Sequence, residues 1–237
     1  MATKTYLQLV NKTLLLLREP QVAAVAADYS LLIGEYVNQA KEKVEKAWRW
    51  RALVTELTFT TLNAQQNYLL QSTATPPVTS STGRFPDERA FLARDDDYTA
   101  QVFDITVTGQ NYRLKEFDLE DYTYINYVGG ANTVNQQPAA FASTGGQTPA
   151  IALLALPPAG RIIKSRWYIP QDEFSVGSEI LLVPWRPVVS LAYALANEER
   201  GEELGVDGQL LFSKAADDLA LAIANETESD IMEMRPD

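Results

Sequence analysis

The spacing of apolar residues predicts a long helix over residues 28–52. Apolar side chains recur there at steps of three and four, which places them on one helix face: Ile33, Tyr36, Val37, Ala40, Val44, Ala47 and Trp48. Asp28 or Ser30 can accept a hydrogen bond from a backbone N–H group at the start of this helix. Glu42 precedes Lys46 by one turn, an order that favours an ion pair. We therefore expect an amphipathic helix that packs one face against a core.

The same period predicts three further helices. The first covers residues 5–17 and is expected to end because of Pro20, since the residue before a proline is forced out of helical geometry. Another begins at Pro187, the position in the first turn that proline prefers, and a last helix runs from about residue 207 to 225. The first helix should lie against the long one.

The middle of the chain has the two-residue period of strands. Strands are predicted at 54–61, 68–71, 101–107, 112–117, 122–128, 151–156, 162–169 and 179–183. Residues 129–150 are polar and are expected to form a long loop. The predicted fold class is α+β, a helical bundle formed by the N- and C-terminal helices with an inserted antiparallel β-rich domain. The expected parts are residues 1–53, the β-rich insertion 54–185, and residues 186–237, whose helices and acidic tail complete the bundle.

Tryptophan and arginine occur together at Trp48–Arg51, Arg161–Trp167 and Trp185-Arg186. Such clusters can stack on nucleic-acid bases, or they can make contacts between a ring and a guanidinium inside an interface or between the helical and β parts. Trp48 itself is expected in the core, because its helical spacing from Val44 would bury its large apolar area.

Composition argues against an enzymatic role for this chain. It contains neither Cys nor His, so it has no disulfide, no thiolate and no imidazole to act as a general base or metal ligand. We expect no enzyme, no cofactor and no metal site. No apolar run approaches about 18 residues and no signal segment opens the sequence, so neither a membrane span nor export by the usual route is expected.

The charge is acidic overall and unevenly distributed. The net charge is −11, which argues against simple coating of a nucleic-acid backbone. Residues 1–53 carry +3, residues 54–185 carry −6 and residues 186–237 carry −8. Either the acidic C-terminal part is a solvated face, or the two ends pack together or against neighbouring copies with complementary charge.

Other candidate sites carry little chemistry. Residues 95–97 are three aspartates that could hold a hard cation, but the following residues lack the spacing of a calcium loop, so a solvated turn is expected. The 31 acidic residues offer many carboxylate pairs for glycoside hydrolysis and single out none. Gly129-Gly130 and Gly145-Gly146 do not open a helix with a P-loop lysine.

The order of features resembles the head-to-tail adaptor proteins of tailed bacteriophages, the group of podovirus tail tubular protein A and related connectors. The resemblance rests on LLLLREPQV (14–22), KAWRW (46–50), the β insertion and VPWRPVVSLAYALANEERGEE (183–203), followed by an acidic last helix. Arg18 stands where a glycine or small residue is common in the family. The β insertion is longer than in the shortest relatives, so its loops cannot be matched to loops of the family.

The resemblance implies a structural virion protein, made in the host cytoplasm and located at the head–tail interface. The expected partners are the portal protein, the tail (nozzle or tail-tube) proteins and further copies of the chain, in a ring of about twelve. Genomic DNA would pass through an acidic lumen without being recognised, because such a lumen offers no anchors for phosphates. No membrane is expected as a partner.

Two other functions remain open at this point. One is a carboxylate-based cell-wall (peptidoglycan) hydrolase of the tail, suggested by the many acids and by the hydrolytic activity attributed to some adaptor relatives. The other is a β-sheet ligand-binding module, suggested by Tyr122, Tyr124 and Tyr127 of a predicted strand.

The residues expected at partner interfaces combine aromatic rings, arginines and the acidic C-terminal segment. They are Trp48, Trp50, Arg51, Trp185, Arg186, Arg200, Glu226, Glu228, Asp230, Ile231, Met232 and Met234.

Overall fold

The computed structural model describes residues 3–95, 98–128, 137–145, 148–154, 156–200 and 206–233, with the backbone alone for 126–128, 206–207 and 228–233. Its described part is mixed α+β, with five α-helices and two sheets. Contacts divide the chain into two compact units. One combines Met1–Ala52 with Gln171–Asp237 and is called the helical unit here; the other, Leu53–Pro170, is called the β unit.

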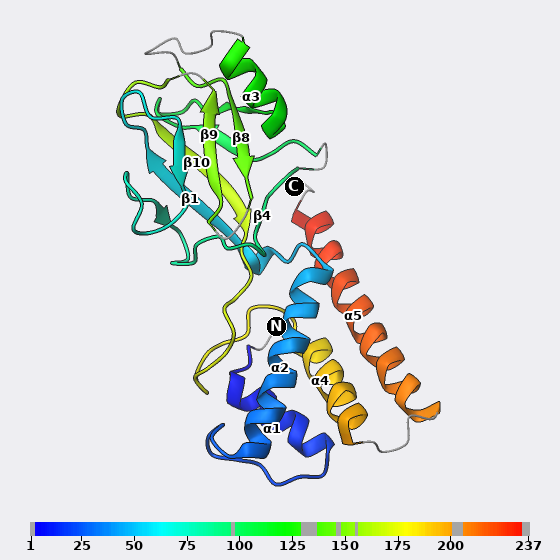
Figure 1. Ribbon diagram of the computed structural model, residues 1–237. Helices are drawn as coiled ribbons and strands as arrows, with labels where there is room; N and C mark the ends of the chain where they lie inside the picture. The colour runs from blue at the N-terminus through cyan, green and yellow to red at the C-terminus, as the bar shows by residue number, and fades with distance from the viewer. Residues whose placement is uncertain are drawn as a thin grey trace. The chain divides into compact units, whose positions relative to one another are not determined.

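The helical unit contains α1 (Tyr6–Leu16), α2 (Asp28–Ala47), α4 (Trp185–Arg200) and α5 (Val206–Glu233). Helix α4 packs against α1, α2 and α5, and α1 also packs against α2 (Figure 1). Three alanines of α4 are buried, Ala192, Ala194 and Ala196, and their small side chains let neighbouring helices approach on more than one side. The unit therefore joins helices from both ends of the sequence around α4.

Helix α1 is capped at both ends by local hydrogen bonds. At its start, Thr5 Oγ1 accepts from the Gln8 N–H and Gln8 Oε1 accepts from the Thr5 N–H, a capping box. At its end, Arg18 has a left-handed backbone (φ 60°), and the Glu19 N–H donates to the Leu14 carbonyl at 2.9 Å. The expectation that Pro20 ends this helix is wrong, because the left-handed residue ends it first.

Helix α2 follows the predicted pattern over most of its length. Ser30 Oγ accepts from the Ala27 N–H at 3.1 Å, and the Lys46 ammonium lies 2.6 Å from the Glu42 carboxylate, as expected. The helix ends at Ala47, however, and residues Arg51–Leu53 form a short 3-10 turn, η1.

This early end places Trp50, and not Trp48, in the core. Trp48 has an extended backbone, so it no longer continues the helical face of Val44, and its side chain is 37% exposed. Trp50 is fully buried instead, and its indole N–H donates to the Val44 carbonyl at 2.7 Å. The prediction that Trp48 lies in the core is therefore wrong.

One face of α2 also buries polar side chains that the sequence did not indicate. Asn38 exchanges two hydrogen bonds with the backbone of Phe174, at 3.0 and 3.1 Å. Lys41 Nζ donates to the Gln171 and Asp172 carbonyls, and Glu45 Oε1 accepts from the Gln171 N–H at 3.2 Å. These three side chains hold the segment 171–174 where the chain returns to the helical unit.

The β unit contains two sheets. The first has the order β3-β1-β10-β5-β6, with β4 also paired to β10, and every pair is antiparallel. The second has the order β2-β9-β8-β7 and is antiparallel except for the β7–β8 pair. The strands of the first sheet are β1 (Val54–Thr60), β3 (Thr79–Ser80), β4 (Phe91–Leu92), β5 (Val102–Asp104), β6 (Tyr112–Arg113) and β10 (Ile162–Tyr168). Those of the second are β2 (Asn67–Leu69), β7 (Lys115–Glu116), β8 (Ala140–Thr144) and β9 (Ala150–Leu154).

The core of the β unit draws side chains from both sheets. Leu57 and Phe59 of β1 alternate with outward residues and join Ile151 of β9 and Phe141 of β8 in one buried cluster. Phe59 also stacks on Tyr68, with ring centroids 4.6 Å apart. The two-residue period of the sequence therefore marks β1 and β10 correctly.

Three predicted segments of the β-rich middle are wrong. Residues 122–128 belong to a helix, α3 (Leu119–Val128), and not to a strand. Glu120 and Asp121 favour a helix N-terminus, and a short apolar run does not distinguish the two structures by period alone. Residues 179–183 make one isolated bridge, Thr5 to Ile180, and no strand. The expected loop 129–150 contains β8; its residues 129–136 and 146–147 lie outside the described residues.

Candidate interaction surface at the start of α4

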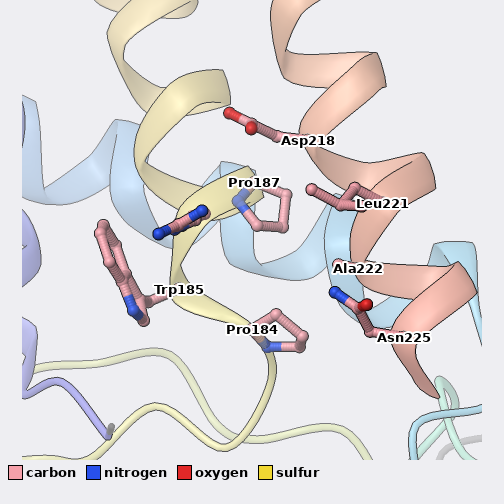
Figure 2. Close-up of a pocket in the computed structure, with 8 residues that line it drawn as sticks. Pro184, Trp185, Pro187, Asp218, Leu221, Ala222 and Asn225 are labelled. Carbon is pink, nitrogen blue, oxygen red and sulfur yellow. The ribbon is translucent and has the colours of Figure 1, made fainter. Parts of the chain in front are cut away.

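Two adjoining cavities open where α4 begins. One has a volume of about 380 Å³ and lies between the start of α4 and the middle of α5 (Figure 2). The other has a volume of about 390 Å³ and shares Pro184, Trp185 and Asn225 with the first. Its walls also include Lys4, Trp50 and the segment 181–183. Both cavities lie within the helical unit.

The α4 side of the first cavity is formed by the sequence Pro184-Trp185-Arg186-Pro187. Pro187 lies in the first turn of α4, where its missing N–H group costs no helical hydrogen bond. The two prolines fix the backbone on either side of Trp185 and Arg186. Figure 2 shows the Trp185 ring on the side of the α4 ribbon opposite to Leu221 and Ala222 of α5. The sequence thus makes this wall rigid.

Trp185 is partly buried, and two cationic side chains lie near its ring. Lys12 Nζ of α1 lies 4.6 Å from the ring centroid, and the guanidinium of Arg186 lies 5.8 Å from it. Both distances are within the range of cation–π attraction. The sequence predicted the Arg186 contact from adjacency, but Lys12 is 173 positions from Trp185 and gave no signal.

The α5 side of the first cavity combines apolar and polar side chains. Leu221 is 53% exposed, whereas Ala222 is buried against α4. Asp218 accepts a short hydrogen bond from the Ser190 hydroxyl of α4, which fixes the register of the two helices. The cavity therefore offers an apolar floor with an amide, an aspartate and an arginine at its rim.

Several residues expected at an interface gather here. Trp50, Trp185 and Glu226 line the second cavity, and Trp185 and Arg186 line the first. The N–H of Arg51 donates to Glu226 Oε1 at 3.0 Å, which ties α5 to the segment after α2. These five residues, distant in sequence, lie at one place in the fold.

The other expected interface residues lie elsewhere. Trp48 is exposed and lines neither cavity. Arg200 lies at the far end of α4, where its guanidinium is 2.7 Å from the Glu19 carboxylate and also binds the Tyr29 hydroxyl. The side chains of Glu228, Asp230, Ile231 and Met232, and the whole of Met234, lie outside the described residues.

Arg200 makes its hydrogen bonds to other residues of the same chain. Burial lowers its pKa, but the hydrogen bonds to Glu19 and Tyr29 outweigh burial, so the pKa lies above its usual value. Nearby, burial and a hydrogen bond to Glu199 raise the pKa of Tyr36 to about 12. Both groups stay in their ordinary protonation states near neutral pH.

Asp95, from the three aspartates considered as a cation site, makes contacts within the chain. Asp95 lies 2.5 Å from the Arg113 guanidinium and accepts from the Thr99 N–H, whereas Asp96 and Asp97 lie outside the described residues. Among the described residues, no group of three or more acidic side chains is placed to hold a metal ion. No helix in that part of the chain has the length and apolar character needed to cross a membrane.

The tyrosine row expected on a strand does not form. Tyr122 is buried in α3, and its hydroxyl donates to the Leu153 carbonyl at 3.2 Å. Tyr124 is 66% exposed, and the side chain of Tyr127 lies outside the described residues. Because α3 is a helix, positions 122 and 124 do not share one face as they would on a strand.

Comparison with known proteins finds no matching family model and no matching curated protein. Any functional assignment therefore rests on the residues and geometry of this chain.

Proposed function

We propose that this chain is a structural, non-enzymatic head-to-tail adaptor of a tailed-phage virion, which forms a ring between portal and tail and surrounds the exit channel for DNA. The observation that carries the proposal is the helical unit, in which α1 and α2 from the start of the chain pack with α4 from its end. This order of elements agrees with the adaptor resemblance of the sequence.

The finer architecture is part of the same proposal. The four long helices form one bundle, and the strands between Leu53 and Pro170 form a domain inserted into it. In the ring, the bundle builds the wall, the C-terminal segment reaches toward the portal and the β domain faces the tail proteins. The segment charge of −8 in residues 186–237 suits a channel through which DNA slides without binding.

The aromatic and basic surface at the start of α4 supports a role in protein contact. Exposed cavities with apolar walls, tryptophans and an arginine are typical of interface hot spots. No specific observation favours the cell-wall hydrolase, and the tyrosine row that suggested a ligand-binding module is absent from α3.

Electron microscopy of the purified protein with the portal protein of its own genome tests the proposal. The expected result is a ring of added density beneath the portal, absent from either component alone. A chain shortened after Thr227 keeps the Glu226 contact to Arg51 and removes only the last ten residues, so it tests docking by the C-terminal segment. A bare portal with the full chain would refute the adaptor assignment; unchanged binding of the shortened chain would refute C-terminal docking alone.

A further inference from the structure

Three cationic side chains lie around the two cavities at the start of α4. Arg186 lines the first cavity and Lys4 lines the second. Lys12 Nζ lies 4.6 Å from the ring centroid of Trp185, a residue that both cavities share. Among the described residues, none makes an ion pair or a hydrogen bond with any of these three cationic groups. The two cavities and the three cations are together called the α4 site here.

Two of these cations have lost part of their contact with water. Lys4 and Lys12 are half-buried, although lysine is a residue that is mostly exposed in folded proteins. A cation that is partly removed from water is costly unless an opposite charge lies beside it. The Trp185 ring attracts Lys12 but does not neutralise it. An anion from outside the chain would therefore be stabilised more at this site than beside a fully exposed lysine.

The two acids that line the cavities are already bonded within the chain. Asp218 accepts from the Ser190 hydroxyl, and Glu226 Oε1 accepts from the Arg51 N–H at 3.0 Å. Three cations thus lie beside two anions, an excess of one positive charge in a chain whose net charge is −11. The groups of the α4 site that still lack a bonding partner in the described part of the chain are the positive ones, so the site favours an anionic ligand.

The apolar wall indicates which class of anion fits. Leu221 is 53% exposed and lies opposite Pro187 across the first cavity, with Ala222 next to it (Figure 2). The volume of about 380 Å³ is in the range of pockets that hold a ligand group. A phosphate backbone would leave this apolar wall uncovered. A peptide can cover it with an apolar side chain while its carboxylates lie against the cations, so a protein segment fits better than a nucleic acid.

We propose that the α4 site binds a segment of the portal protein in which apolar side chains are flanked by aspartate or glutamate. An apolar side chain fills the first cavity between Pro187 and Leu221, and the carboxylates lie against Arg186 and the two lysines. The inference rests on the proposed function, because it names the chemistry of the partner that the adaptor would bind. Asn225 and Glu226 line the site and directly precede the C-terminal segment that is proposed to reach toward the portal, so the portal is the partner within reach.

Peptide titration of the full-length protein tests the ligand chemistry. The chain has four tryptophans, so its indole N–H groups give four signals in a nitrogen-15 NMR spectrum, and Trp185→Phe identifies one of them. The probe is a capped peptide of sequence Asp-Leu-Glu-Leu-Asp, which should shift the Trp185 signal until it saturates. The matched peptide Lys-Leu-Lys-Leu-Lys keeps the leucines and reverses the charge, and it should give no saturable shift.

Substitutions separate the site from the overall charge of the chain. Arg186→Glu reverses an exposed charge and should weaken binding of the acidic peptide about tenfold, and Lys4→Glu should do the same. Lys43→Glu is the matched control, because it makes the same change of charge at an exposed position of α2 that lines neither cavity, and it should leave binding unchanged. Leu221→Ser should also weaken binding, since it removes apolar area from the wall.

Three results would overturn the proposal. The first is no shift of the Trp185 signal at up to about 5 mM acidic peptide, or equal binding of the acidic and basic peptides. The second is an equal or larger shift with a short thymidine oligonucleotide, which would make the ligand a nucleic acid. The third is a shift that grows with the concentration of the chain alone, which would make the occupant a second copy.

Microscopy with the portal separates this proposal from the adaptor function. Arg186→Glu should lose most of the added density beneath the portal, whereas Lys43→Glu should keep it. A portal that acquires the same ring with Arg186→Glu would leave the adaptor function standing and overturn the α4 site as the portal contact. Saturable binding of the acidic peptide with a portal that stays bare would leave the peptide chemistry standing and remove both the adaptor function and the portal as the partner.

Discussion

Replacing Gly34 with alanine should destabilise the helical unit, although the same change usually stabilises a helix. A methyl group at Gly34 of α2 would lie 2.1 Å from the Tyr6 hydroxyl oxygen, 3.1 Å from Tyr6 Cζ and 3.3 Å from Val25 Cγ1. Tyr6 is 5% exposed and its ring lies 5.4 Å from that of Phe174, so it has little room to move away. Helix propensity favours alanine by about 1 kcal/mol, whereas overpacking of this kind costs about 1–3 kcal/mol. A contact as close as 2.1 Å calls for the upper part of that cost, about 2–3 kcal/mol, so we expect a net loss of about 1–2 kcal/mol in the free energy of unfolding.

The assay is urea unfolding followed by circular dichroism at the helical band, with two comparisons. In a Tyr6→Phe background the hydroxyl is gone, so the cost of Gly34→Ala should fall close to zero and the coupling between the two changes should be about 1–2 kcal/mol. Gly208→Ala in α5 is the matched control, because no atom lies within 4 Å of its added methyl group, and it should stabilise by about 0.5 kcal/mol. If Gly34→Ala stabilised the protein as Gly208→Ala does, the close approach of α1 and α2 at this point would be refuted.

Three other changes test the local energetics, each by urea unfolding. Arg18→Gly should stabilise by about 1 kcal/mol, because glycine adopts the left-handed backbone at φ 60° without steric cost; a destabilisation would contradict the assigned end of α1. Asp104→Ala should cost about 3 kcal/mol, since this buried carboxylate lies 2.8 Å from the Arg161 guanidinium and its loss leaves that cation without its partner, and adding Arg161→Met should recover part of the loss. Burial raises the pKa of Glu56, but hydrogen bonds from Lys164 and Arg166 outweigh it, so the pKa lies below its ordinary value of 4.5. Glu56 therefore stabilises the fold above about pH 4.5 and loses this effect as the pH falls through the lowered pKa, so Glu56→Gln should cost about 1 kcal/mol at pH 7 and nothing at low pH; an equal cost at both would count against the ion pairs.

Local patterns in the sequence predicted an element correctly where its structure depends mainly on its own residues. The three- and four-residue spacing marked α1 and α2, and the ion pair of Glu42 with Lys46 followed from their separation by one turn. The alternation in β1 marked a half-buried strand because its odd and even positions face different surroundings. In these cases the period alone carries the information.

Contacts between distant segments could not be predicted from local sequence patterns. The burial of Lys41 depends on carbonyl groups about 130 positions later, and no local pattern distinguishes it from an exposed helical lysine. Which of Trp48 and Trp50 is buried depends on where α2 ends, which is the least certain feature of a periodic pattern. The second cavity at the start of α4 brings together Trp50, Trp185 and Glu226, which lie far apart in the sequence.

The hydrogen bonds from α2 to the segment 171–174 also set an order of events during synthesis. Asn38 and Lys41 receive their partners only after at least 130 further residues have been made. At ordinary rates of about 5–20 residues per second, this takes roughly 7–26 s, so α1 and α2 are made well before the segment 171–174 that their side chains bind. The β unit is continuous in sequence and can fold during that interval, so the helical unit is the part of the chain that is completed last.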